Sequence, residues 1–291
     1  MIRVKAPAKL NLFLHVGDKR SDGFHALESL VVFAEECDVL SFEHADQLSL
    51  RITGPFGDAL NDLPDNFVLR AALALHSERG AKITLEKNLP IAAGIGGGSA
   101  DAGATLRGLN IFWKLERDVE ELSEIAATLG SDVPACLLSE PAWVTGRGEI
   151  VRVVGSIAPF ELVLVNSNSP LATAGVFSRL NVRSGLGAMR VPGEEITVVW
   201  DLVGYLGDSG NDLEAPACAI APIIDEVIEA LAHEPGCVLS QMSGSGATCF
   251  GIFQEGVWAD GAAERIKQDH ADWWVRRSRI AQSDIGVPKS L

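Results

Sequence analysis

The chain has 291 residues, of which 47% are hydrophobic and 22% charged, as is typical of a globular protein with a sizeable core. Its formal net charge of −15 argues against nucleic acids and anionic membranes as partners, because both would be repelled. No run is as long as a membrane span, and the apolar stretch 10–16 is interrupted by Asn11 and His15, so we expect no signal peptide and a cytoplasmic protein. Five scattered cysteines without a CxxC pair predict reduced, mostly buried thiols, and we assign no metal-ligating side chain.

The first half of the chain begins with strands and then mixes helices with strands. Alternating apolar residues predict strands at 3–16, 27–44, 47–53 and 81–86. Helical spacing predicts helices from an Asn66 cap to before Gly80, along the stripe from Ala102 to Trp113, at 119–129 and from residue 131.

The second half follows the same pattern. We predict mostly strand over 142–165, a loop at 183–193, strands at 236–240, 247–253 and 272–280, and helices at 215–233 and 257–268. The longer helix would turn inward the side chains of Ile220, Ile223, Ile224, Val227 and Leu231. This order predicts an α+β protein of two domains, 1–155 and 156–291.

The most informative segment is 89–101, which reads LPIAAGIGGGSAD. Its glycines allow φ > 0 and let a ligand approach the backbone, and the helix start that follows offers free N–H donors to a phosphate chain. No lysine follows, so it is not a Walker loop, and Ser99 stands where a dinucleotide fingerprint needs its third glycine. A flexible glycine hinge is the alternative interpretation.

Three further segments carry unusual residues. Lys9 and Asn11 share one face of an apolar strand, where a lysine either faces a site or lies in water on an edge strand. Asp132 is either a helix cap or a carboxylate that works beside a lysine. Residues 242–247, MSGSGA, form either a hairpin turn or a second nest for an anion.

Taken in order, the segments PAKLNLFLHV…DGFH, LPIAAGIGGGSADAGATL, LGSDVP and MSGSGATCF resemble the GHMP small-molecule kinase superfamily. More narrowly, the first pair resembles those members that phosphorylate a cytidylylated alcohol on the non-mevalonate route to isoprenoid precursors. The resemblance implies an N-terminal half like ribosomal protein S5 domain 2, a ferredoxin-like C-terminal half, and an active site in the cleft between them.

The resemblance also implies ATP as co-substrate, with Mg²⁺, and a set of site residues. The implied ATP contacts are Asn66 and Lys87 near the adenine, and Pro90, Gly94, Gly96, Gly97, Gly98, Ser99 and Ala100 around the phosphates. By resemblance Asp132 is the catalytic base and Lys9 its electrostatic partner. The implied acceptor contacts are Asn11, Phe24, His25, Phe177, Gly244, Ser245 and Gly246.

Two departures from the family pattern are visible. The loop usually continues Ser-Ser-Asn, whereas this chain has Ser99-Ala100-Asp101, which leaves Asp101 either as an outer-sphere contact of Mg²⁺ or without effect. Phe24 stands where tyrosine is common and keeps the stacking face. Two alternatives remain: a homoserine or mevalonate kinase, whose substrates have no base to stack, and a non-catalytic nucleotide sensor, which need not keep Lys9 and Asp132. The oligomeric state stays open.

Overall fold

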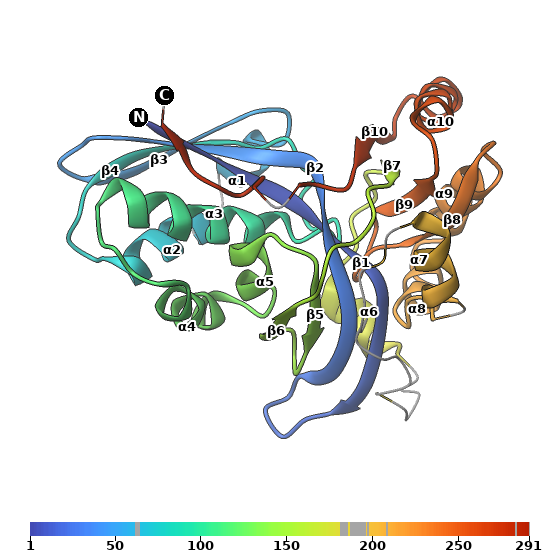
Figure 1. Cartoon of the computed structure of the whole chain (residues 1–291), viewed down its shortest axis with the longest axis horizontal. Coiled ribbons are helices and arrows are strands. Elements are labelled where there is room, and N and C mark those ends of the chain that lie inside the picture. The colour runs from blue at the N-terminus through green and yellow to red at the C-terminus, as the bar shows by residue number, and fades with distance from the viewer. Residues whose placement is uncertain are drawn as a thin grey trace.

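The structure is a computed structural model that describes residues 1–61, 65–180, 186, 196, 198–207, 209–282 and 284–290. It contains two sheets, each with helices against it (Figure 1). The larger sheet has the order β11-β1-β2-β4-β3, with β5 added on β2 and β6 on β5. Its strands are β1 (Ile2–Lys19), β2 (His25–Glu43), β3 (Leu48–Thr53), β4 (Ala81–Glu86), β5 (Ala142–Thr145), β6 (Ile150–Val153) and β11 (Lys289–Ser290).

Helices of the first half cover one face of this sheet. They are α1 (Asp58–Asn61), α2 (Phe67–Leu75), α3 (Gly97–Phe112), α4 (Val119–Leu129) and α5 (Val133–Leu138). The predicted signals at two helix ends are confirmed: the Asn66 side chain accepts a hydrogen bond from the N–H of Val68, and α4 stops at Gly130. Helix α3 lies so close to the sheet that a Cβ on Gly108 would come 2.3 Å from the Phe42 ring.

The smaller sheet is antiparallel, in the order β10-β7-β9-β8. Its elements are β7 (Glu161–Asn166), α6 (Thr173–Ser178), α7 (Val199–Leu206), α8 (Glu214–Cys218), α9 (Ile223–Ala232), β8 (Cys237–Met242), β9 (Cys249–Phe253), α10 (Gly256–Asp269) and β10 (Trp274–Arg279). A β-α-β-β-α-β succession with this strand order is ferredoxin-like. The α+β class and the ferredoxin-like second half are therefore confirmed.

An irregularity in β1 decides which face its side chains take. Val4 and Ala6 pack with the helices, whereas Leu10 and Leu12 pack against the smaller sheet. The register against β2 shifts between Pro7 and Lys9, and a shift by one residue exchanges the two faces of a strand. Lys9 consequently points to the side of α3 and α5.

Some predicted elements need correction. The stretch 142–165 is three strands, because Gly146 and Gly148 make a turn between β5 and β6. The helix predicted over 215–233 is divided into α8 and α9 at Pro222, since proline cannot donate within a helix. Ile220 falls at this break and is 37% exposed rather than inward, and Ile223 is half-buried, whereas Ile224, Val227 and Leu231 are buried as predicted.

The structure also describes the cysteines and most of the remaining predicted segments. All five cysteines are free and three of them are buried, and burial raises the pKa of Cys136 to about 12. None of the helices in the described ranges has the length and apolar character that a membrane crossing needs. The predicted loop at 183–193 lies outside the described residues except for Leu186.

Candidate active site

A cavity of about 640 Å³ lies where the glycine segment, the start of α5 and the turn at 243–246 meet. Every predicted site residue lines it except three. Ala100 is fully buried within α3, Gly246 is buried in its turn, and the His25 ring lies beside Phe177. The sequence motifs, which are far apart along the chain, therefore meet around one space.

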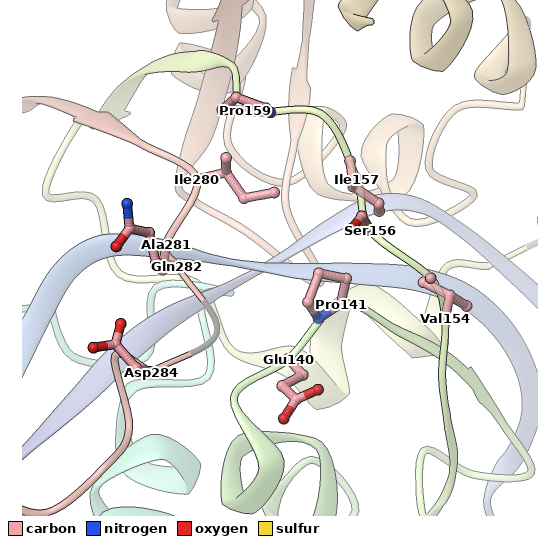
Figure 2. A pocket seen from close by; sticks show the side chains of 11 residues that line it. Glu140, Pro141, Val154, Ser156, Ile157, Pro159, Ile280, Ala281, Gln282 and Asp284 are labelled. Carbon is pink, nitrogen blue, oxygen red and sulfur yellow. The ribbon is translucent and has the colours of Figure 1, made fainter. Parts of the chain in front are cut away.

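A second cavity, of about 600 Å³, has a different lining (Figure 2). It lies between the Glu140–Pro141 turn, the connection from β6 to β7 and the segment after β10. Figure 2 shows two carboxylates on its walls, Glu140 and Asp284, and no lysine or arginine is among the described residues that line it. A phosphate chain would be repelled there, so the first cavity is the candidate active site.

The glycine segment shapes the wall where phosphates would lie. Gly94 and Gly96 have φ of 76° and 64°, and Gly96 is the N-cap of α3. Gly97 and Gly98 instead belong to the first turn of α3, so the expected φ > 0 is confirmed for only two of the four glycines. Because N–H groups in the first turn of a helix have no partner within it, they are available to an anion that lies over the loop.

Lys9 and Asp132 form an ion pair at the floor of the cavity. Lys9 Nζ lies 3.0 Å from Asp132 Oδ1, with the Lys9 side chain 6% exposed and the Asp132 side chain 42% exposed. Asp132 occupies the N-cap position of α5, but its side chain makes no capping hydrogen bond. The two alternative interpretations of these residues are therefore wrong: the Lys9 side chain does not lie in water on an edge strand, and the Asp132 carboxylate does not cap α5. A Cβ on Gly96 would lie 3.2 Å from Lys9 Cβ, so the pair adjoins the glycine segment.

Asn11 holds the neighbouring part of the wall together. Its N–H donates to Ser243 Oγ at 3.2 Å, and its side-chain NH₂ donates to Ser29 Oγ at 2.8 Å. Ser243 Oγ in turn donates to the Gly94 carbonyl, so β1, the glycine segment and the 243–246 turn are connected. The buried Asn11 Oδ1 has no hydrogen-bond partner among the described residues.

Aromatic rings occupy another wall. Phe24 is 48% exposed, and the Arg147 guanidinium lies 5.0 Å from its ring centroid. The rings of His25 and Phe177 are 5.7 Å apart and tilted by 33°, and His25 Nδ1 lies 2.9 Å from the Gly17 carbonyl. Thus residues of β2 and α6 meet across the two halves of the chain.

A buried charge cluster supports the glycine segment from below. Lys87 Nζ lies 2.5 Å from Asp38 Oδ2 and 2.6 Å from Asp101 Oδ2. Asp38 Oδ1 also accepts the N–H groups of Asn88 and Leu89. A Cβ on Gly97 would lie 3.2 Å from Lys87 Nζ, so the ammonium is directly beneath the first turn of α3.

The two ionisable partners in this cluster are shifted in the same direction. Burial raises the pKa of Asp101 to about 8, against the lowering effect of Lys87. Burial also opposes the charged form of Lys87, but Asp101 and Asp38 outweigh it and raise the pKa of the ammonium. Because one lysine serves two buried carboxylates, burial of Asp101 is only partly offset by Lys87 and its pKa stays above the ordinary value. The Asp101 residue is 3% exposed and turned to Lys87.

Sequence reasoning missed several residues that the structure brings to this site. Arg147 lines the cavity, and its position between Gly146 and Gly148 was a signal for a turn that projects a basic side chain. Asp38 sits within an apolar strand, which is the same signal that singled out Lys9. Other lining residues, such as Phe67 and Thr173, carry no signal of their own.

Two family models match segments in the two halves of the chain. Residues 66–140 match the GHMP kinases N terminal domain, and residues 201–274 match the GHMP kinases C terminal domain. The 4-diphosphocytidyl-2-C-methyl-D-erythritol kinase of Parvibaculum lavamentivorans is 47% identical over 278 residues, covering 94% of this chain and 96% of that protein.

Solved structures agree in fold. A crystal structure of 4-(cytidine 5'-diphospho)-2C-methyl-D-erythritol kinase is 29% identical, with a TM-score of 0.74, and covers 96% of this chain and 100% of the other. A homoserine kinase from Cytophaga hutchinsonii has a TM-score of 0.73 at 21% identity, covering 99% of this chain and 96% of its own. The latter likeness shows a shared fold alone.

Proposed function

The chain belongs to the 4-diphosphocytidyl-2-C-methyl-D-erythritol kinase family of GHMP kinases, and we propose that it phosphorylates the 2-hydroxyl of that cytidylylated alcohol with ATP. This reaction belongs to the non-mevalonate route to isopentenyl diphosphate. The observation that supports it most directly is the Lys9–Asp132 pair, which lies beside a glycine segment in the same cavity as the aromatic rings of Phe24 and Phe177.

The residues divide into an ATP side and a catalytic pair. Gly94, Gly96 and the first turn of α3 hold the phosphates with backbone N–H groups, which act as fixed dipoles in a protein of high negative charge. We assign the adenine to the region of Asn66 and Pro90, which line the same cavity. Lys87 supports the phosphate segment from beneath, because its ammonium is committed to Asp38 and Asp101.

Asp132 accepts the proton of the attacking hydroxyl. A general base must lie within hydrogen-bond reach of that proton, and Asp132 is the carboxylate that is open to the cavity on one side and held by a lysine on the other. The Lys9 ammonium, 3.0 Å from Asp132 Oδ1, orients this carboxylate and stabilises negative charge on the acceptor oxygen. Burial of Lys9 in β1 fixes its position before the substrate arrives.

The acceptor lies along the remaining walls. Phe24, His25 and Phe177 hold the cytosine, because aromatic faces bind a flat base by stacking. Asn11, which lines the cavity together with Lys9, contacts the alcohol end of the acceptor in this proposal. The turn Gly244–Gly246 closes this end, where Ser245 Oγ lies 2.9 Å from Thr173 Oγ1.

Mg²⁺ accompanies the nucleotide in this proposal. The described residues contain no group of three or more metal-ligating side chains. This fits an ion that keeps its waters and binds mainly to phosphates, with one or two protein oxygens. Ser99, on the cavity wall, would supply one such oxygen. When bound, the ion neutralises phosphate charge.

Two further proposals concern organisation. We place the domain boundary near residue 155, between β6 and β7, with domains 1–155 and 156–291. The short β11 returns to pair with β1 of the first sheet, and Figure 1 shows the two termini side by side. We propose the cytoplasm as the compartment, consistent with five free cysteines.

An acceptor panel tests the function. ATP consumption is measured with 4-diphosphocytidyl-2-C-methyl-D-erythritol, homoserine and mevalonate as separate acceptors. The proposal predicts that kcat/KM for the cytidylylated acceptor exceeds the others by more than about 100-fold, because only that acceptor fills the aromatic wall. Comparable turnover of homoserine would replace this function with that of the fold neighbour, and binding of ATP without any turnover would indicate a sensor.

A further inference from the structure

The cations that line the active-site cavity differ in how they are neutralised. Lys9 is paired with Asp132, and Lys87 is shared by Asp38 and Asp101. Arg147 lines the same cavity, and its guanidinium forms no ion pair within the described residues. The nearby carboxylates are engaged elsewhere: Glu149 accepts the backbone N–H of Arg147, and Asp22 pairs with Arg20. The Arg147 guanidinium therefore has no carboxylate in ion-pair contact within the described residues; it donates to the Ala127 carbonyl at 3.5 Å and acts on Asp22 at longer range.

The turn that carries Arg147 is fixed between two parts of the site. On one side the guanidinium lies over the Phe24 ring. On the other side the turn packs on the residue before Asp132, since a Cβ on Gly148 would lie 3.2 Å from Ser131 Cβ. The Gly146 carbonyl also accepts the N–H of Leu27 at 2.8 Å, which holds the turn to β2. Arg147 thus extends from a rigid turn that joins the aromatic wall to the catalytic carboxylate.

The acceptor has a matching order of groups. Its cytosine stands at one end and its methylerythritol at the other, joined by a diphosphate. If the cytosine lies at Phe24 and the reacting hydroxyl at Asp132, the diphosphate lies between them, on the side of the Arg147 turn. The ATP phosphates have their own donors in the glycine segment, so the diphosphate needs a separate partner.

We propose that Arg147 binds the diphosphate bridge of the acceptor and so selects a nucleoside-diphosphate-linked alcohol over a free one; this rests on the proposed function. A guanidinium suits the role because its planar fork bonds phosphate oxygens in pairs. One of its nitrogens donates to the Ala127 carbonyl at 3.5 Å, and stacking on Phe24 leaves the other edge N–H groups for a ligand. In a protein of charge −15, the local cation also offsets the general repulsion of a dianionic bridge.

The test compares cytidine with CDP. Binding of each is measured by calorimetry, with a non-hydrolysable ATP analogue saturating the nucleotide site. The variants are Arg147→Met, which keeps an apolar stem over Phe24, and Arg147→Lys, which keeps the charge. Arg152→Met is the matched control, because Arg152 is an exposed arginine of β6 outside the cavity. Thermal unfolding and ATP affinity verify that each variant is folded.

We expect Arg147→Met to weaken the binding affinity for CDP about 10- to 100-fold and to change the affinity for cytidine less than about twofold. Arg147→Lys should recover part of the lost CDP affinity, and Arg152→Met should leave the affinities for both ligands unchanged. Equal losses for cytidine and CDP would overturn the proposal, since Arg147 would then only order Phe24. Unchanged CDP affinity would overturn it as well. If the wild type bound neither ligand, the cytidine site of the proposed function would fall together with this assignment.

Discussion

Lys9 Nζ lies 3.0 Å from Asp132 Oδ1, yet the Lys9 side chain is 6% exposed and the Asp132 side chain 42% exposed. The difference in exposure gives the two side chains different roles. The lysine is fixed within a strand and cannot leave, whereas the carboxylate keeps a free face toward the cavity. A base that is held from behind and open in front can receive a hydroxyl proton without first losing its own partner.

Asp132→Asn should lower kcat about 10²- to 10⁴-fold, the usual range for loss of a general base. The fold should persist, because Asp132 makes no capping bond and the amide oxygen can still accept a hydrogen bond from Lys9. Steady-state kinetics give kcat, and calorimetry with ATP verifies that the nucleotide site is intact. A folded variant with wild-type kcat would remove Asp132 from the role of base.

Gly94→Ala should weaken ATP binding about tenfold or more. At φ of 76° a side chain is strained, and its Cβ would lie 2.4 Å from the Ser243 carbonyl oxygen, so the glycine segment must move. Gly204→Ala is the control, because a Cβ there meets nothing within 4 Å. Calorimetry with ATP measures both. Native affinity in the Gly94 variant would mean that the segment is a hinge and does not hold phosphates.

Asp101 should make stability depend on pH. Its folded pKa of about 8 lies above the ordinary value of 3.8, so between these pH values the folded chain holds a proton that the unfolded chain has lost. Stability from this group is complete at low pH and is lost as the pH rises through about 8. Asp101→Asn cannot ionise, so its unfolding free energy should fall less between pH 6 and pH 9, as urea titrations can measure.

The control for that experiment is Asp269→Asn, an exposed residue at the end of α10. It should keep the wild-type pH dependence. An Asp101→Asn curve parallel to that of the wild type would show that Asp101 is ionised throughout this range, paired with Lys87.

Phe177→Ala should raise KM for the acceptor about 10-fold or more, from the loss of base stacking worth about 1–3 kcal/mol. The kcat should fall less than kcat/KM if the contact is equal in the ground and transition states. ATP affinity should stay nearly constant, because the ring faces His25 on the acceptor wall. Equal damage to ATP and acceptor binding would make Phe177 a core residue. Ile220→Ala, at an exposed nearby position, is the control.

Local patterns in the sequence predicted much of the site. Lys9 and Asn11 stood out because polar residues interrupt an apolar strand, and the glycine segment stood out by its conformational freedom. What the sequence could not predict was the side on which Lys9 lies, because that depends on the register shift after Pro7. The pairing of Lys87 with Asp38 could not be predicted either, since it joins the residue after β4 to a residue of β2 through tertiary packing.

Two errors in the predicted helices could have been avoided from the sequence. Pro222 within a helical pattern is a signal for a helix boundary, and ignoring it produced one helix in place of α8 and α9. Helix α7 was not predicted, although Val199, Leu202 and Leu206 have helical spacing and are buried.

The proposed function is the transfer of one phosphoryl group from ATP to the acceptor hydroxyl that reaches Asp132. Phosphorus NMR of the product formed by the wild-type protein from ATP and 4-diphosphocytidyl-2-C-methyl-D-erythritol tests it most directly. We expect one product, with a new phosphate on the 2-hydroxyl, and one ADP formed for each acceptor molecule consumed. A phosphate on a different hydroxyl, or ADP and free phosphate released while the acceptor stays unchanged, would contradict it.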